Sequence, residues 1–180
     1  MGVLDWIRFV IYYVSFVAIL IGYSWTIVLF IAGNRYLKRL SDEPAGTESD
    51  YLWVFMVPAL NEGVTIADSV ARLRAVAATH KVIVVINDGS DDDTGEVLQR
   101  IGGDDLEVLT RVPPNARTGK AAALNAAFDF VRREILAKPG YAGFDTDRVI
   151  FGIVDADGRL SADAPAFVSR HFRDPAVGGV

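Results

Sequence analysis

The chain has 180 residues, an apolar share of 51% and a formal net charge of -5. This acidic balance argues against nucleic acid as a partner, because binding to a phosphate backbone requires a clustered basic surface. The absence of cysteine excludes disulfide bonds and thiolate chemistry.

The apolar residues are concentrated near the start of the chain. Residues 9–33 contain no charged residue and are rich in Ile, Val, Leu, Phe and Tyr. At about 1.5 Å per residue, roughly 25 such residues span the ~30 Å hydrocarbon core of a bilayer. A signal peptide is the alternative, but its apolar region is only about 7 to 15 residues long and ends at a small-residue cleavage site. We therefore predict a retained transmembrane helix at residues 7–34.

The charges around this helix predict its orientation. Arg35, Lys38 and Arg39 follow the span, whereas Arg8 and Asp5 precede it. Because positive charge is enriched on the cytoplasmic side of membrane helices, the rest of the chain is expected at the cytoplasmic face of the cell membrane. The three basic residues also suit contact with lipid headgroups.

A juxtamembrane linker is expected at residues 35–50, and a soluble domain at residues 51–180. The end of the linker is polar and acidic and contains Pro44 and Gly46, which favour irregular structure.

Within the soluble domain, short apolar runs of strand length alternate with segments that carry helix signals. Strands are predicted at residues 52–57, ending before Pro58, and at 82–86, 106–109 and 149–154, with another beginning at 177–180. Two helices are indicated by an apolar face, formed by Ile66, Val70, Leu73 and Ala77 in the first and by Leu124, Phe128, Val131 and Ile135 in the other. Between them, the acidic residues Asp91, Asp92 and Asp93 favour the start of a helix that runs through Ile101. Ser161 is a candidate N-cap for a last helix to about Phe172.

This alternation predicts an α/β fold with a parallel sheet covered by helices on both faces. The chain ends inside an apparent strand, and the roughly 130 residues after the linker are fewer than many α/β domains contain. We therefore expect the N-terminal part of a larger domain.

Polar residues follow three of the predicted strands. In a parallel sheet these strand ends lie on one edge, where open α/β sheets bind ligands. The three segments are Pro58-Ala59-Leu60-Asn61-Glu62, Asn87-Asp88-Gly89-Ser90 and Asp155-Ala156-Asp157-Gly158. The carboxylates of Asp155 and Asp157 suit a hard divalent cation held against a phosphate. Three independent polar turns remain the alternative.

Lys120 stands at the start of the third predicted helix, where backbone N–H groups and the helix dipole attract anions. It offers a positive charge to a phosphate, although a solvated lysine fits the spacing equally well. A Walker loop is excluded, because it requires a glycine in place of Pro114 and a Ser or Thr in place of Ala121. The chain also lacks a Gly-x-Gly-x-x-Gly motif after a strand.

Four segments in this order resemble the family 2 glycosyltransferases of GT-A fold. They are residues 57–62, 87–90 with 93–94, 119–125 and 155–157, and the resemblance covers roughly residues 52–180. It is strongest to the membrane-bound, polysaccharide-synthase-like branch, which includes cellulose and hyaluronan synthases.

The resemblance implies a nucleotide-sugar donor, usually a UDP-sugar, and a glycan or lipid acceptor. It places the nucleoside against Asp88, which would meet the base, and against the loop residues Pro58, Ala59, Leu60 and Glu62. Lys120 would lie near the donor phosphates. Asp155 and Asp157 would be the catalytic pair that binds the diphosphate through Mg²⁺ or Mn²⁺, with Asp157 as the direct metal ligand. The implied reaction is an inverting displacement at the anomeric carbon.

The chain departs from the family pattern in three places. Leu60 stands where many relatives have an aromatic residue, and Asn87 stands where others have Asp. The acidic general base and the Gln-x-x-Arg-Trp motif of processive members have no match before Val180. We therefore expect donor binding with little transfer. The other hypotheses are a non-catalytic, membrane-tethered nucleotide-binding or interaction domain and a metal-dependent phosphoryl-transfer enzyme.

Overall fold

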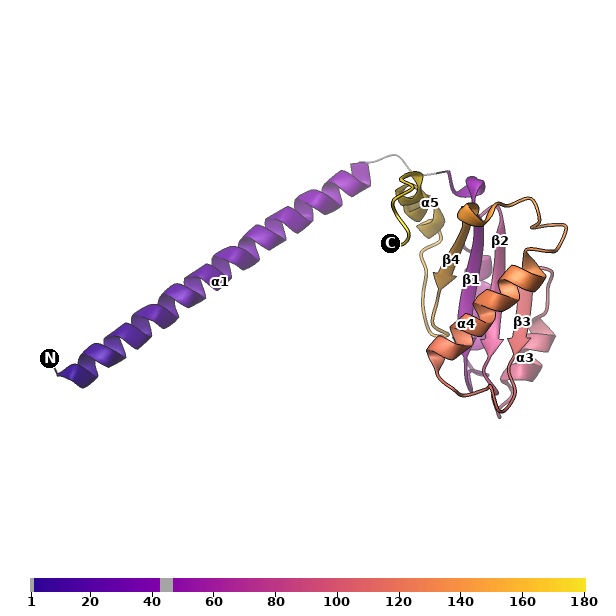
Figure 1. Cartoon of the computed structure of the whole chain (residues 1–180), viewed down its shortest axis with the longest axis horizontal. Coiled ribbons are helices and arrows are strands. Elements are labelled where there is room, and N and C mark those ends of the chain that lie inside the picture. Colours follow the sequence, from indigo (N-terminus) through magenta and orange to yellow (C-terminus); the bar gives the residue numbers. More distant parts are fainter. Residues whose placement is uncertain (1, 43–46) are drawn as a thin grey trace. The chain divides into compact units, whose positions relative to one another are not determined.

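The computed structural model describes residues 2–42 and 47–180, without the side chains of residues 40–42. It contains two separate units (Figure 1). One is the long helix α1 (Val3–Asp42), and the other is an α/β unit that holds the remaining elements.

Helix α1 is long and apolar enough to cross a membrane. Apolar side chains lie all around the helix rather than on one face, a pattern typical of a helix that spans a membrane. The helix continues through residues 35–42, where the start of the linker was predicted, because this segment contains neither Gly nor Pro and is rich in Leu, Lys and Arg. Pro44 and Gly46 of the predicted linker lie outside the described residues.

The α/β unit is built on a four-stranded parallel sheet with strand order β3-β2-β1-β4. Its strands are β1 (Leu52–Ala59), β2 (Lys81–Asn87), β3 (Leu106–Thr110) and β4 (Val149–Ile153). The predicted parallel sheet is thus confirmed, and the carboxyl ends of all four strands lie on one edge.

Strand β1 continues through Pro58, where the prediction ended it. Pro58 pairs with Ile86 of β2, whereas the pairing of β1 with β4 has already ended at Met56. A proline without an N–H donor is tolerated here because this end of β1 has a strand on one side only.

Helices cover both faces of the sheet, as predicted (Figure 1). One face packs against α2 (Ile66–Arg74) and α3 (Thr94–Ile101), and the other against α4 (Lys120–Phe130) and the π-helical turn Val131–Ile135. The central strands are buried on both faces, which explains why they read as continuous apolar runs.

Two helix faces differ from the predicted ones. Helix α2 ends at Arg74, so Ala77 lies beyond it and is exposed, and Val76 is buried instead. Helix α4 packs against the sheet through Ala123 and Ala127, because small side chains allow a close approach. Two of the predicted face residues, Val131 and Ile135, are buried in the same cluster, as expected. The other two are not: Leu124 is half-buried, and the 41% exposed Phe128 packs against Phe151 with ring centroids 4.8 Å apart.

The prediction for the end of the chain was wrong in detail. Helix α5 (Ala164–Ser169) begins after Asp163, because Pro165 fits only the first turn of a helix. Ser161 is not its N-cap; it hydrogen-bonds to the Asp163 carboxylate. A 3₁₀ turn, His171–Arg173, replaces the last helical turn. Residues 177–180 form no strand, since two glycines there disfavour extended pairing.

Candidate functional site

A pocket of about 440 Å³ lies at the carboxyl edge of the sheet. Its lining comes from four segments that are far apart in the sequence: Pro58, Ala59, Leu60, Glu62, Asp88, Arg117, Gly119, Lys120, Ala123, Asp155, Ala156 and Asp157. Every residue that the sequence predicted for the site lines this pocket. The structure therefore brings these residues together, while their individual roles remain predictions.

The loop after β1 is tied to the loop after β2. Asn61, in a left-handed conformation with φ of 61°, donates its N–H to Oγ of Ser90 at 3.0 Å. The N–H of Glu62 donates to Oγ1 of the buried Thr94 at 2.9 Å. Asn87 accepts the N–H of Ser90 at 3.0 Å, so the amide at this position closes the turn after β2. These contacts make two walls of the pocket one connected unit.

Ion pairs and hydrogen bonds also fix the acidic residues behind these loops. The Arg117 guanidinium holds the pKa of Asp91 below its usual range, with a smaller contribution from Asn61. The hydroxyl of Thr94 has the same effect on the pKa of Asp92. Both carboxylates are therefore charged at neutral pH and serve to hold the loops.

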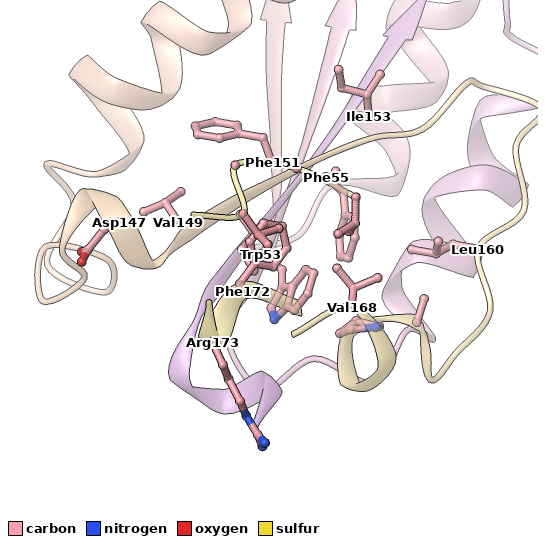
Figure 2. Close-up of a pocket in the computed structure, with 18 of the residues that line it drawn as sticks. Trp53, Phe55, Asp147, Val149, Phe151, Ile153, Leu160, Val168, Phe172 and Arg173 are labelled. Atoms are coloured by element: carbon pink, nitrogen blue, oxygen red, sulfur yellow. The ribbon is translucent and has the colours of Figure 1, made fainter. Parts of the chain in front are cut away.

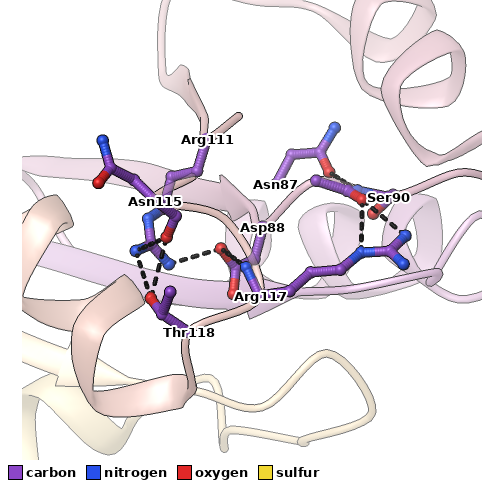
Figure 3. A network of polar contacts seen from close by, with 8 residues as sticks. Asn87, Asp88, Ser90, Arg111, Asn115, Arg117 and Thr118 are labelled. Atoms are coloured by element: carbon purple, nitrogen blue, oxygen red, sulfur yellow. Dashed lines mark hydrogen bonds and ion pairs between the residues drawn. The ribbon is translucent and has the colours of Figure 1, made fainter. Parts of the chain in front are cut away.

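Asp88 lies at the centre of a buried polar network (Figure 3). Its Oδ1 accepts a hydrogen bond from Nη1 of Arg111 at 2.5 Å, and the two side chains are only 9% and 8% exposed. The backbone N–H of Arg117 donates to the same oxygen at 3.1 Å. The buried charge of Asp88 is thus paired, as a buried carboxylate requires.

The sequence did not reveal two arginines that contribute to the site: Arg117 lines the pocket, and Arg111 supports Asp88 from behind it. Arg111 also donates to the carbonyl of Asn115 and, at 3.1 Å, to Oγ1 of Thr118. Arg117, in a left-handed conformation with φ of 58°, donates to the carbonyl of Gly89 at 3.0 and 2.8 Å. The sequence does show basic residues between β3 and α4, which could have suggested a partner for Asp88. Their spacing along the chain, however, does not show which of them contacts Asp88.

The turn after β4 presents two carboxylates to the pocket. Gly158 closes it with an N–H bond of 2.8 Å to the carbonyl of Asp155, and a Cβ on Gly158 would lie 2.9 Å from that same oxygen. The buried hydroxyl of Ser69 donates to the carbonyl of Ala156 and holds the turn from behind. The side chains of Asp155 and Asp157 are exposed, and the buried Ala156 between them is held in place by Ser69.

The two carboxylates differ in their partners. Oδ1 of Asp155 accepts a hydrogen bond from Nζ of Lys120, the first residue of α4. Within the described ranges 2–42 and 47–180, the Asp157 carboxylate has neither a hydrogen bond nor an ion pair. Asp157 is thus the carboxylate that is open to an incoming ligand.

This donor set fits a hard divalent cation. In the described part of the chain, no group of three or more His, Cys, Asp or Glu side chains is arranged to hold a metal. Mg²⁺ is commonly held by one or two carboxylates, with water and substrate phosphates as the other ligands. Asp155 and Asp157 match that pattern and would hold the cation together with water or a phosphate.

A larger pocket of about 710 Å³ runs along the edge strand β4 (Figure 2). Its walls are largely apolar and include Trp53, Phe55, Val168 and Phe172. None of the predicted site residues line it. The convergent charged groups lie in the smaller pocket, which is therefore the candidate site.

Comparison with known proteins agrees with this assignment. The family model for glycosyl transferase family 2 matches residues 54–176. The poly-β-1,6-N-acetyl-D-glucosamine synthase of Staphylococcus aureus is 30% identical over 132 residues, which cover 70% of this chain and 27% of that protein. The synthase of the same name from Staphylococcus epidermidis is 25% identical over 168 residues, covering 85% and 35%. The chain thus spans only part of these relatives.

Among solved structures, the mannosyltransferase PcManGT of Pyrobaculum calidifontis, in complex with GDP-Man and Mn²⁺, is similar with a TM-score of 0.56. The similarity covers 85% of this chain and 43% of that one, at 24% sequence identity. This likeness confirms the predicted GT-A fold. The family model covers most of the α/β unit and the segments that line the pocket, and the chain therefore belongs to glycosyl transferase family 2.

Proposed function

We propose that this chain forms the donor-binding part of a membrane-anchored glycosyltransferase that moves a sugar from a UDP-sugar to a glycan or lipid acceptor. The observation that carries the proposal is the pocket at the carboxyl edge of the sheet. It gathers a buried, paired Asp88, a helix start with Lys120, and the carboxylates of Asp155 and Asp157. The names of the staphylococcal relatives, which are polysaccharide synthases, support a glycan product.

In this proposal each wall of the pocket binds one part of the donor. Asp88 and the loop from Pro58 to Glu62 hold the nucleoside. Lys120 and the backbone N–H groups at the start of α4 face the diphosphate, because a helix N-terminus favours anions. Asp155 and Asp157 bind the divalent cation, and the solved neighbour with GDP-Man and Mn²⁺ supports this assignment.

The proposed reaction is an inverting displacement at the anomeric carbon. Asp155 and Asp157 would hold a divalent cation, which would supply Lewis-acid stabilisation of the charge on the departing nucleoside diphosphate. Lys120 and the start of α4 stabilise the same charge electrostatically. The acceptor hydroxyl attacks from the opposite face of the sugar and gives its proton to a general base. The residues assigned here bind and activate the donor, and none of them is assigned the role of that base.

The proposal also places the pocket at the cytoplasmic face of the cell membrane, with α1 as the anchor. The length and apolar composition of α1 support the anchor, and the basic residues Arg35, Lys38 and Arg39 near its end support the orientation. The test is protease accessibility of the α/β unit in sealed inverted and right-side-out membrane vesicles. Cleavage only in the inverted vesicles is expected, and cleavage only in the right-side-out vesicles contradicts the orientation.

Donor binding is tested by titrating the full chain in detergent with UDP, with and without Mn²⁺. We expect binding that depends on Mn²⁺ and is abolished by Asp157→Ala. The matched control is Asp129→Ala, because Asp129 is exposed on α4 and does not line the pocket. Absence of UDP binding by the folded chain contradicts the proposal, and phosphate release from a generic phosphomonoester favours a phosphoryl-transfer enzyme instead.

A further inference from the structure

We propose that Arg111 is a positioning residue that makes the pocket selective for a uridine nucleotide by fixing Asp88 as a hydrogen-bond acceptor. This inference rests on the proposed function, since it concerns the nucleoside end of the same pocket. It goes beyond that function because Arg111 does not itself line the pocket and acts through Asp88, which does.

The two oxygens of Asp88 are in different situations. Oδ1 accepts two hydrogen bonds, from Nη1 of Arg111 at 2.5 Å and from the backbone N–H of Arg117 at 3.1 Å. In the part of the chain that the structure describes, Oδ2 accepts none. One oxygen therefore orients the carboxylate, and the other is left for a ligand in the pocket.

Arg111 is itself held so that it can impose this orientation. Its side chain is only 8% exposed, and its Nη2 donates to Oγ1 of Thr118 at 3.1 Å and to the carbonyl of Asn115. Its backbone N–H donates to the carbonyl of Asn87 at 2.9 Å. A guanidinium fixed at both ends of its planar fork keeps the Asp88 carboxylate from rotating.

The chemistry of the free oxygen selects the base. An ionised carboxylate accepts hydrogen bonds and donates none, so its partner on the base must be an N–H group. Uracil carries an N–H at ring position 3, whereas cytosine has a lone pair there, which the carboxylate repels. A carboxylate fixed in one orientation therefore favours UDP over CDP.

The test compares the dissociation constants of UDP and CDP in the presence of Mn²⁺. For the wild-type chain we expect UDP to bind about ten- to a hundredfold more tightly, the range of one hydrogen bond to a charged group. Arg111→Gln is expected to reduce this ratio to within about threefold, while Arg111→Lys, which keeps a charge but not the planar fork, gives an intermediate ratio. Arg100→Gln is the matched control, because Arg100 is exposed on α3.

The outcomes separate this inference from the proposed function. If wild type binds UDP with Mn²⁺ but Arg111→Gln weakens UDP and CDP equally, Arg111 is merely structural and the inference is overturned, while the proposed function stands. If the wild-type chain does not bind UDP at all, both the proposed function and the inference about Arg111 are contradicted.

A second variant covers the case in which Arg111→Gln does not fold, which circular dichroism shows. Asp88→Asn places an amide that also donates a hydrogen bond, so the preference is expected to move towards CDP. A folded Asp88→Asn chain with an unchanged ratio overturns the inference.

Discussion

Nζ of Lys120 donates a hydrogen bond to Oδ1 of Asp155 and thereby joins the start of α4 to the turn after β4. The two side chains are 53% and 61% exposed, so water screens their attraction and the pair contributes little to stability. Lys120 thus binds Asp155 at an oxygen that a metal cation could also bind. If the proposed site binds a divalent cation, we expect the cation and Lys120 to compete for this carboxylate until a diphosphate offers Lys120 another partner.

This competition predicts opposite effects of Lys120→Met on metal and nucleotide. Without nucleotide, Mn²⁺ is expected to bind about fivefold more tightly, because one neighbouring positive charge is removed. With Mn²⁺ present, UDP is expected to bind less tightly, because its diphosphate loses a cation. Electron paramagnetic resonance of free Mn²⁺ and calorimetric titration of UDP measure the two effects.

Lys138→Met is the control for the lysine substitution. Lys138 pairs with Glu107 and does not line the pocket, so its loss should change neither affinity. Weaker Mn²⁺ binding by nucleotide-free Lys120→Met contradicts the competition.

Ser69 supports the turn that carries the two carboxylates. Its buried hydroxyl lies within hydrogen-bond distance of the carbonyl of Ala156 and, at 3.1 Å, of the carbonyl of Thr65. Ser69→Ala is expected to lower the free energy of unfolding by about 1 kcal/mol, the usual value of one such bond. It should also weaken Mn²⁺-dependent UDP binding severalfold, because Asp157 is no longer held in place.

The control is Ser161→Ala, which removes an exposed hydroxyl whose partner is Asp163. This change should leave UDP binding unaltered. If Ser69→Ala binds UDP and Mn²⁺ as tightly as the wild type, the turn does not depend on Ser69.

The sheet and the acidic turn were predictable because their signals are local. Apolar runs of strand length mark buried strands, and the carboxyl ends of parallel strands must share an edge, so the sequence alone places Asp88 and Asp155 on the same edge. The prediction wrongly ended the strand before Pro58. Pairing of β1 with β4 stops at Met56, so no strand on that side requires an N–H donor from Pro58, and the sequence of β1 alone does not show this.

The supporting residues were not predictable because their partners are distant in the sequence. Arg111 and Asp88 are joined by the packing of two loops, and Ser69 reaches Ala156 across the sheet edge. Nothing in the spacing around Arg111 or Ser69 distinguishes them from a surface arginine or an ordinary helical serine. A periodic pattern shows which face of an element is buried, and it does not show which polar group that face will meet.

Thr94 is a buried link between the first two loops of the pocket. Its side chain has 0% exposure, accepts the N–H of Glu62 at 2.9 Å and donates to Asp92 at 2.5 Å. Thr94→Val keeps the shape but leaves the Glu62 N–H without a partner. We expect a loss of about 1 to 3 kcal/mol in the free energy of unfolding and a fall of about 4 to 12 °C in Tm.

Thr94→Ser is the matched control, because it keeps the hydroxyl and removes only a methyl group. It should retain most of the stability that valine loses, as measured by thermal unfolding followed by circular dichroism. Equal Tm values for the serine and valine variants mean that the hydroxyl does not hold the Glu62 loop.

The ion pair between Arg74 and Asp105 is expected to make the free energy of unfolding fall at acidic pH. Arg74 donates from Nε to Oδ2 at 2.9 Å and from Nη2 to Oδ1 at 2.8 Å, and these bonds hold the pKa of Asp105 below its ordinary value of 3.8. Because the folded state binds this proton less readily than the unfolded state, the stabilisation is present above about pH 4 and is lost as the pH falls through the folded-state pKa. Asp105→Asn removes the titrating group, so its free energy of unfolding should fall less steeply between about pH 4 and pH 2 than that of the wild type. Urea unfolding at several pH values measures both slopes, and identical slopes contradict a stabilising role for the Arg74–Asp105 pair.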